Sequence, residues 1–434
     1  MTSDHVHHVE DDDPRSRAAD RAVRSLLLFV ITPLAVVTLI GLVLLWPGRD
    51  PEVPPEVGPP ATAVKATVEQ STFRDCPPEQ GGAEATCQVV GLRLHGGPDR
   101  GLATELVLNV VANPGIPTLA QGDRIVVQPI GGDGSYTFVD FQRTRPLLLL
   151  GIVFSVLVVA LARWKGLAAL VGLLVTLLVL AKFVLPAILD GKDPLAVCIV
   201  GASVTMFVVF YLAHGINVRS STALVGTLLS LLVTGVLATW ATSASRLTGT
   251  GTEEALTLNA LAGQVDLRGL LLGGIIIGGL GVLNDVTITQ ASTVWQLHLA
   301  DPAARPRQLY RQGMQVGRDH IGATVDTLIL AYAGAALPLL IFFSLADRSF
   351  GEVITSSLVA EEVVRSLVGA IGLVLSVPIT TALAAAAASR APVGPAGAPD
   401  APAESTTAAR ARAAARDLLR RRPADPWADK RDPH

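Results

Sequence analysis

The segment Gly273–Ser292 combines a glycine-rich run with polar residues whose types and spacing could do chemistry. It contains Asn284, Asp285 and Thr289. On a helix, Thr289 lies one turn beyond Asp285 on the same face. A carboxylate in this apolar setting must face protein or water, because exposing it to lipid costs several kcal/mol. We expect it to bind H⁺, Na⁺ or another small solute or ion.

A second segment, Gly317–Thr327, places Asp319, Gly322 and Asp326 on one helical face. If its helix runs antiparallel to the first, Asp285 and Asp326 each lie roughly 5 to 8 Å inside the same membrane boundary. The carboxylates could then be level with one another. We therefore predict a coupling site for an ion or solute at Asn284, Asp285, Thr289, Asp319 and Asp326.

The same residues could also have a structural or an enzymatic role. Asp285 could cap or hydrogen-bond a neighbouring helix, and Arg318 could pair with Asp319 at the membrane surface. An intramembrane aspartyl protease also uses two Asp on adjacent helices, but its Gly-x-Gly-Asp pattern is absent here. No zinc-protease helix and no serine nucleophile elbow is present in the sequence. We therefore expect no enzyme, no cofactor and no metal.

The elements that position these residues are helices of membrane length. Half of the chain is hydrophobic and 16% is charged, against about 25% in soluble proteins. Runs of roughly 20 apolar residues predict spanning helices. The eight predicted spans are Leu26–Trp46, Leu147–Ala162, Leu167–Leu189, Leu195–Ala213, Thr222–Ala241, Leu270–Ile288, Ala323–Leu345 and Val363–Ala388.

Small residues indicate where helices could pack closely. Gly274 and Gly278 have the small-xxx-small spacing that lets backbones approach. We predict helix packing at Gly274, Gly278, Gly281 and Gly322, and a homo-oligomer is possible.

The loop charges predict the orientation in a bacterial cytoplasmic (plasma) membrane. Arg and Lys concentrate in the loops that share a side with both termini, which places both termini in the cytoplasm. The net charge of −3 gives no reason to expect nucleic acid.

The first outer loop contains short alternating runs separated by Gly and Pro, which favour a small β-barrel or sandwich. An irregular disulfide-pinned loop is the alternative. Cys76 and Cys87 lie close together on this oxidising side and predict a disulfide.

These features predict an all-α integral membrane bundle with a small extracytoplasmic β-domain. The predicted parts are a cytoplasmic tail (1–25), an anchor helix (26–46), a Pro-rich spacer (47–60), the β-rich domain (61–145), a seven-helix membrane domain (146–388) and a cytoplasmic Ala/Pro/Arg-rich tail (389–434).

Several of these motifs together resemble the YibE/F family of bacterial multi-pass membrane proteins. The resemblance rests on the Gly-rich helix ending in Asp285, on Ser292-Thr293, and on the run from Gly313 through Gly317-Arg318-Asp319-His320-Ile321-Gly322 to Gly334 and Pro338. It extends over about Gly122 to Pro378. It implies a membrane protein without an established activity. Asp326 departs from the family's pattern, where a neutral residue is expected.

Two function classes follow from these observations. The first is transport or coupling of a small solute or ion across the membrane, with Asp285 as the central residue. The second is an envelope interaction or sensing protein that acts through its outer domain. Intramembrane Asp residues favour the first class, and a folded outer domain favours the second.

Overall fold

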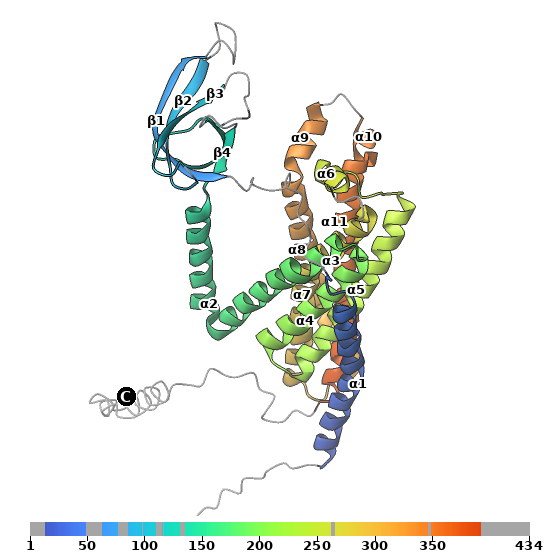
Figure 1. Ribbon diagram of the computed structural model, residues 1–434. Helices are drawn as coiled ribbons and strands as arrows, with labels where there is room; N and C mark the ends of the chain where they lie inside the picture. Colours follow the sequence, from blue (N-terminus) through green and yellow to red (C-terminus); the bar gives the residue numbers. More distant parts are fainter. Residues whose placement is uncertain are drawn as a thin grey trace, which may run out of the picture.

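A computed structural model describes residues 14–48, 63–76, 86–97, 99–109, 115, 117–130, 135–261, 265–345 and 349–391. Most of the predicted Pro-rich spacer and of the C-terminal tail lies outside these residues, as does the start of the N-terminal tail. The described chain forms a helical bundle and a small antiparallel sheet, joined by a long helix (Figure 1).

The bundle contains long helices and short connecting ones. They are α1 (Pro14–Leu44), α2 (Thr144–Val179), the π-helical turn η1 (Leu180–Val184), α3 (Leu185–Leu189), α4 (Pro194–His214), α5 (Val218–Ala244), α6 (Glu253–Leu261), α7 (Leu267–Ala300), α8 (Pro306–Ala335), α9 (Leu337–Leu345), α10 (Phe350–Thr355) and α11 (Ser357–Ala388).

Within the described residues, five helical stretches are long and apolar enough to cross a membrane: Thr144–Leu189, α4, α5, α7 and α11. The pair α8 and α9, bent by 60° at its break, makes a sixth if it is one span. Leu28–Leu44 of α1 is apolar but shorter. The predicted count of eight spans is therefore not established by helix length and composition.

Two breaks account for most of the difference in count. The predicted runs Leu147–Ala162 and Leu167–Leu189 fall in one helical stretch, but the backbone at Arg163 leaves the helical region (φ 55°, ψ −130°) and the helix turns back sharply (Figure 1). The second break is at Ala336, the residue between α8 and α9. Pro338 lies in the first turn of α9 and has no N–H to continue the hydrogen bonds of α8.

Two helices extend further than their apolar runs. α7 continues from the predicted end at Ile288 to Ala300, and α8 begins at Pro306 rather than near Ala323. Both extensions are polar and helical, which a search for apolar runs does not detect. The α8 extension has Pro in its first turn, a position that suits proline's fixed φ.

The outer domain is a single antiparallel sheet with strand order β3-β2-β1-β4-β5. The prediction of a small β-rich domain is confirmed, and the edge strands β3 and β5 contact each other as the sheet curls. Alternating side chains such as Val90, Leu92 and Ile125 fill its interior. The strands are β1 (Val64–Asp75), β2 (Thr86–Leu94), β3 (Ala103–Leu108), β4 (Arg124–Ile130) and β5 (Ser135–Phe141).

Two local contacts fix this domain at its ends. Cys76 and Cys87 form a disulfide beside the β1–β2 pair, as their placement in the sequence predicts. At the other end, both Nη1 contacts of Arg143 to the Asp140 carboxylate measure 2.7 Å, and they lower the pKa of Asp140. This pair lies where β5 ends and α2 begins.

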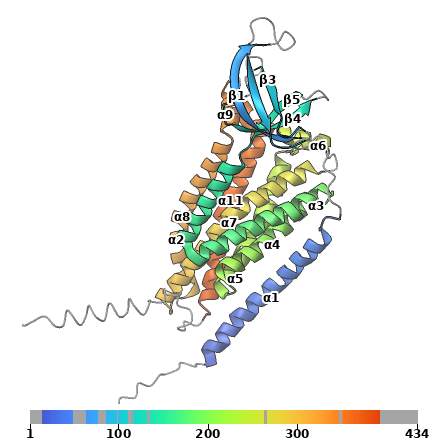
Figure 2. The same cartoon turned by 60° about the vertical axis from the view of Figure 1, so that its left-hand side comes forward.

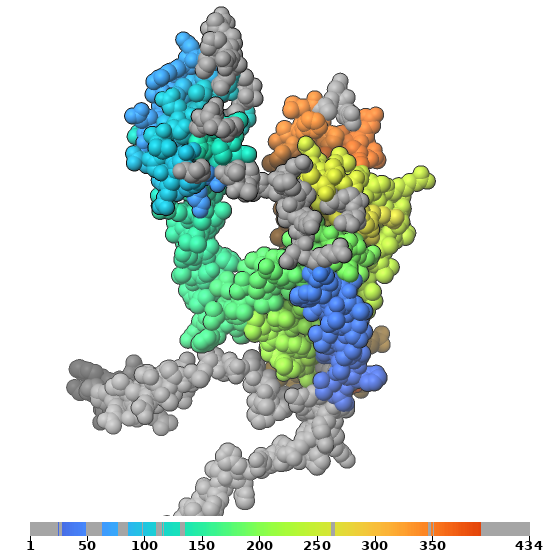
Figure 3. Space-filling model, in the orientation of Figure 1, coloured from blue at the N-terminus to red at the C-terminus, as the bar shows by residue number. Residues whose placement is uncertain are grey.

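The first arm of α2, Thr144–Ala162, holds the sheet away from the bundle (Figure 3). Its apolar side chains are exposed on all sides, for example Leu147, Leu150 and Phe154. The start of α1 and the end of α11 lie at the end of the bundle far from the sheet (Figure 1).

The bundle core consists of α5, α7 and α11, with α4 and α8 packed against it (Figure 2). Small residues allow this close packing. A Cβ added at Gly226 would lie 2.7 Å from Thr380 Oγ1, and one at Gly372 would overlap Thr234 Oγ1. Both glycines are therefore required by contacts between α5 and α11.

We expect Gly372→Ala to destabilise the bundle by about 1 to 3 kcal/mol, because the new methyl group overlaps Thr234 and overpacks the core. Thermal unfolding of the purified protein in detergent measures the change. Gly274→Ala is the matched control, since a Cβ there meets no described atom within 4 Å. Equal stability of the two variants would contradict the packing assigned to Gly372.

Removal of the disulfide by Cys76→Ser and Cys87→Ser together should cost the sheet domain about 2 to 3 kcal/mol, because the bridge closes a short loop in the unfolded chain. Protease resistance of the sheet domain in the full-length protein, with and without reductant, reports this loss. A wild-type domain that reductant does not weaken would show that the sheet is held by its apolar core alone.

Candidate functional site

The open face of α7 carries most of the residues that the sequence singled out. Gly274, Gly278, Gly281, Asp285 and Thr289 are all exposed and recur every three or four residues. The buried face of α7, with Leu283, Val286 and Gln290, lies on the other side. The predicted face therefore exists as one continuous stripe.

The packing role predicted for these glycines is not found within the described chain. A Cβ at Gly274, Gly281 or Gly322 would meet no described atom within 4 Å, and only the one at Gly278 approaches a neighbour, Tyr332 Oη at 3.2 Å. The spacing identified a common face correctly, but that face is turned away from the core.

Other glycines make the close approaches instead. Their added Cβ atoms would lie within 3 Å of a neighbouring helix's side chain. On α7 and α8 these are Gly273 against Cys198, Gly313 against Val294 and Thr381, and Gly317 against Val377.

The candidate carboxylates of α8 lie on one exposed edge. Asp319, Gly322 and Asp326 are exposed, while Gly313, Gly317 and Leu328 of the same helix are buried. The predicted common face of these three residues is thus present in the folded chain.

Contacts between α7 and α8 show where these residues lie relative to one another along the two helices. Gln290 lies beside Gly317, and Gly278 lies beside Tyr332, so the helices run antiparallel. Asp285 lies between Gly278 and Gln290 on α7, so it is level with the middle of α8, near Gly322. Asp319 and Asp326 are three and four residues from Gly322, which is about 5 to 6 Å along the helix axis.

The side chain of Asp285 has no hydrogen-bond or ion-pair partner among the described residues, and neither do Asp319 and Asp326. The alternative that Arg318 pairs with Asp319 is not realised within this part of the chain. Asn284 is half-buried beside Asp285, and its backbone carbonyl accepts a weak bond from Thr287. The three acidic groups are free to bind a cation, a proton or a donor on another molecule.

Buried polar contacts behind this face fix the rotation of α7. The Gln290 side-chain amide donates to the Gly313 carbonyl at 2.8 Å and to Thr381 Oγ1 at 2.7 Å. Thr287 Oγ1 and Thr227 Oγ1 are 2.5 Å apart. These bonds join α7 to α8, α11 and α5, so the carboxylate stripe cannot turn without breaking them.

Two features of the folded chain are not predicted by the sequence. One is Glu361, a buried carboxylate on α11 that accepts the Gly251 backbone N–H at 3.1 Å and so ties the α5–α6 connection to α11. The sequence does not single out Glu361, because the adjacent pair Glu361 and Glu362 looks like the charged residues of an exposed loop.

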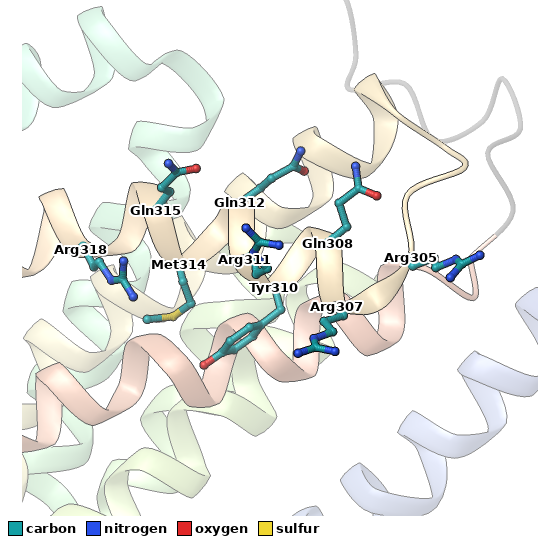
Figure 4. A pocket seen from close by; sticks show the side chains of 9 residues that line it. All are labelled: Arg305, Arg307, Gln308, Tyr310, Arg311, Gln312, Met314, Gln315 and Arg318. Carbon is teal, nitrogen blue, oxygen red and sulfur yellow. The ribbon is translucent and has the colours of Figure 1, made fainter.

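The other is a hollow of about 890 Å³ along the first turns of α8, lined by arginine, glutamine, Tyr310 and Met314 (Figure 4). Its signal is the spacing of Arg307, Arg311 and Arg318, which places them on one face of a helix. Basic residues beside a span also orient the chain, so their presence alone does not indicate a hollow.

Among the residues that the structure describes, no group of three or more His, Cys, Asp or Glu side chains could hold a metal ion. The candidate residues lie on two exposed surfaces, the α7 stripe with Asp285 and the α8 edge with Asp319 and Asp326. On α8, Gly313 and Gly317 face α7 and α11, and the two carboxylates lie on the opposite side of the helix.

Comparison with known proteins identifies the helical part of the chain. No curated protein and no solved structure matches the sequence. The family model described as YibE/F-like protein matches residues 150–390, which is more than half of the chain. The match starts within α2 rather than near Gly122, so it contains the helices from α4 to α11, including α7 and α8, but neither α1 nor the sheet domain. The chain belongs to the YibE/F-like protein family.

Proposed function

We propose that the protein moves or couples a small solute or ion across a bacterial cytoplasmic membrane, using the open face of α7 and α8. One observation carries the proposal: Asp285, Asp319 and Asp326 are exposed and unpartnered among the described residues, and the contacts between α7 and α8 place Asp285 at a level between the two α8 carboxylates. The family match contains this face, which supports assigning the activity to the bundle.

Exposed charge on a spanning helix is costly. A charged carboxylate facing lipid costs about 3 kcal/mol or more at the centre of a helix. Unless water, a bound cation or another protein surface covers them, three such groups would destabilise a membrane-inserted bundle by most of its folding free energy. A hydrated path along α7 and α8 avoids this cost and places acidic groups where a cation or a proton can bind.

The proposed topology has eight crossings. α1, the two arms of the stretch Thr144–Leu189, α4, α5, α7, the bent pair α8 and α9, and α11 would each cross once. The described basic residues favour this arrangement. Arg163 and Lys165 lie at the break in α2, Arg219 lies in the first turn of α5, and the arginines of α8 lie in its first turns. Figure 1 shows the starts of α5 and α8 at the end of the bundle far from the sheet.

Reporter fusions test this topology. Fusions after Lys165, Arg219 and Arg318 should report the cytoplasm, and fusions within Pro51–Arg143 should report the outside, because basic loops are retained inside. A cytoplasmic signal from the latter stretch would overturn the orientation and, with it, the oxidising location of the disulfide.

A second candidate function is interaction or sensing through the sheet domain. The observation that favours it is the isolation of this domain on the first arm of α2, away from the bundle (Figure 3). Deletion of the sheet domain discriminates between the candidates. A transport activity of the bundle should survive the deletion in reconstituted vesicles, whereas a sensing function would be lost.

We expect Asp285→Asn to keep the fold and to abolish pH- or cation-dependent flux, because the amide preserves shape and hydrogen bonding but removes the charge. Flux of H⁺, Na⁺, K⁺ and Mg²⁺ into proteoliposomes, measured beside thermal stability in detergent, is the readout. Glu254→Gln, on the exposed helix α6, is the matched control for loss of one negative charge. It should leave both readouts unchanged.

Asp285→Leu separates coupling from a structural role. If Asp285 only supports an interface, the Leu variant should lose stability while the Asn variant stays normal in stability and flux. Full flux through an Asn variant of normal stability would refute the coupling role of Asp285.

A further inference from the structure

The hollow on α8 is built from one helical segment. Its nine lining residues all belong to 305–318, and its volume is about 890 Å³. Figure 4 shows the three glutamines on one side of the helix and Tyr310, Met314 and Arg307 on the other. Because a single helix lines it, the hollow opens to the surroundings of the bundle and not into its core.

Its arginines form a line. Arg307, Arg311 and Arg318 follow the spacing i, i+4 and i+11, which places them within about 40° of one another around the helix at 100° per residue. The line is about 16 Å long at 1.5 Å per residue. Arg305, the residue that caps α8, adds a fourth guanidinium at its start.

No acidic side chain of the described chain neutralises this line. All four arginines are exposed, and none forms an ion pair with a described residue. The nearest carboxylate along α8, Asp319, lies about 100° around the helix from Arg318. The N-terminal end of α8 adds partial positive charge. The hollow is therefore an uncompensated basic surface.

The side chains at its edges specify the kind of anion. Tyr310 and Met314 are half-buried and lean on the bundle core, so one wall is apolar. The other wall carries the amides of Gln308, Gln312 and Gln315. A ligand that fits has an anionic oxygen-rich part for the guanidinium line and an apolar part for the Tyr310–Met314 wall.

We propose that this hollow binds the phosphate headgroups of anionic phospholipid. Arginine binds phosphate through two parallel N–H donors. Basic segments next to a membrane span attract anionic lipid, and tyrosine is enriched at that depth. The α8 arginines lie in the first half of α8, which with α9 forms a candidate bent span, and they precede the apolar run that begins near Ala323. The inference goes beyond the proposed function and does not require any transport activity.

The test uses the full-length protein in detergent, titrated with phosphatidylglycerol or phosphatidylcholine, with binding followed by native mass spectrometry and thermal stability. The wild type should bind and be stabilised by phosphatidylglycerol in preference to phosphatidylcholine. Each basic residue near an anionic surface changes affinity about 5-fold, so the triple variant R307Q/R311Q/R318Q should bind phosphatidylglycerol about 100-fold more weakly. R246Q, a single-charge control in the α5–α6 connection, should bind as the wild type does.

A second variant distinguishes specific from diffuse attraction. R307K/R311K/R318K keeps the charge but loses the paired donors, so it should retain only part of the preference for phosphatidylglycerol. Because the arginines are exposed and unpaired with described residues, both triple variants should remain folded, and the single variant R311Q checks this with a smaller change.

Three outcomes would overturn the proposal. The first is equal binding of phosphatidylglycerol to the wild type and to R307Q/R311Q/R318Q. The second is equal binding of phosphatidylglycerol and phosphatidylcholine to the wild type. The third is full displacement of the lipid by millimolar inorganic phosphate, which would assign the hollow to a soluble anion. None depends on flux through Asp285, so a failed transport assay leaves this test intact.

Discussion

The buried amide of Gln290 is the contact on which the arrangement of the bundle depends. A buried polar group costs free energy unless its hydrogen bonds are made, and Gln290 makes two, to the Gly313 carbonyl of α8 and to Thr381 of α11. Gly313 and Gly317 give it room, because a side chain at either position would collide with α7 or α11. The amide and the two glycines thus fix both the distance and the rotation of three helices at once.

That rotation decides which residues of α7 and α8 remain open. With Gln290 and Leu283 inward, Asp285 must face outward, since it lies on the opposite side of the same helix. With Gly313 and Gly317 inward, the arginine line and the carboxylate edge of α8 must also face outward. The exposed surface of α8 therefore changes sign of charge along the helix, with basic residues up to Arg318 and acidic residues from Asp319 onward. An anion held at the first turns and a cation held near the carboxylates would not compete for the same side chains.

The parts that were predictable from the sequence rest on local signals. Apolar runs located most of the helices, alternation located the sheet, and two neighbouring cysteines located the disulfide. Within the described chain no neighbour packs against Gly274, Gly281 or Gly322, because spacing shows that residues share a face but not whether a neighbour covers it. The packing glycines Gly226 and Gly372 depend on partners that are distant in sequence, Thr380 and Thr234. Likewise, the hollow on α8 needs the polar extension of that helix, which hydropathy does not reveal.

The extent of the family match bears on where the activity lies. The matched residues 150–390 hold α7, α8 and the Gln290 contacts. The sheet domain lies outside the match. About two thirds of the first arm of α2 belongs to the match, yet the arm extends away from the bundle and exposes apolar side chains on every side.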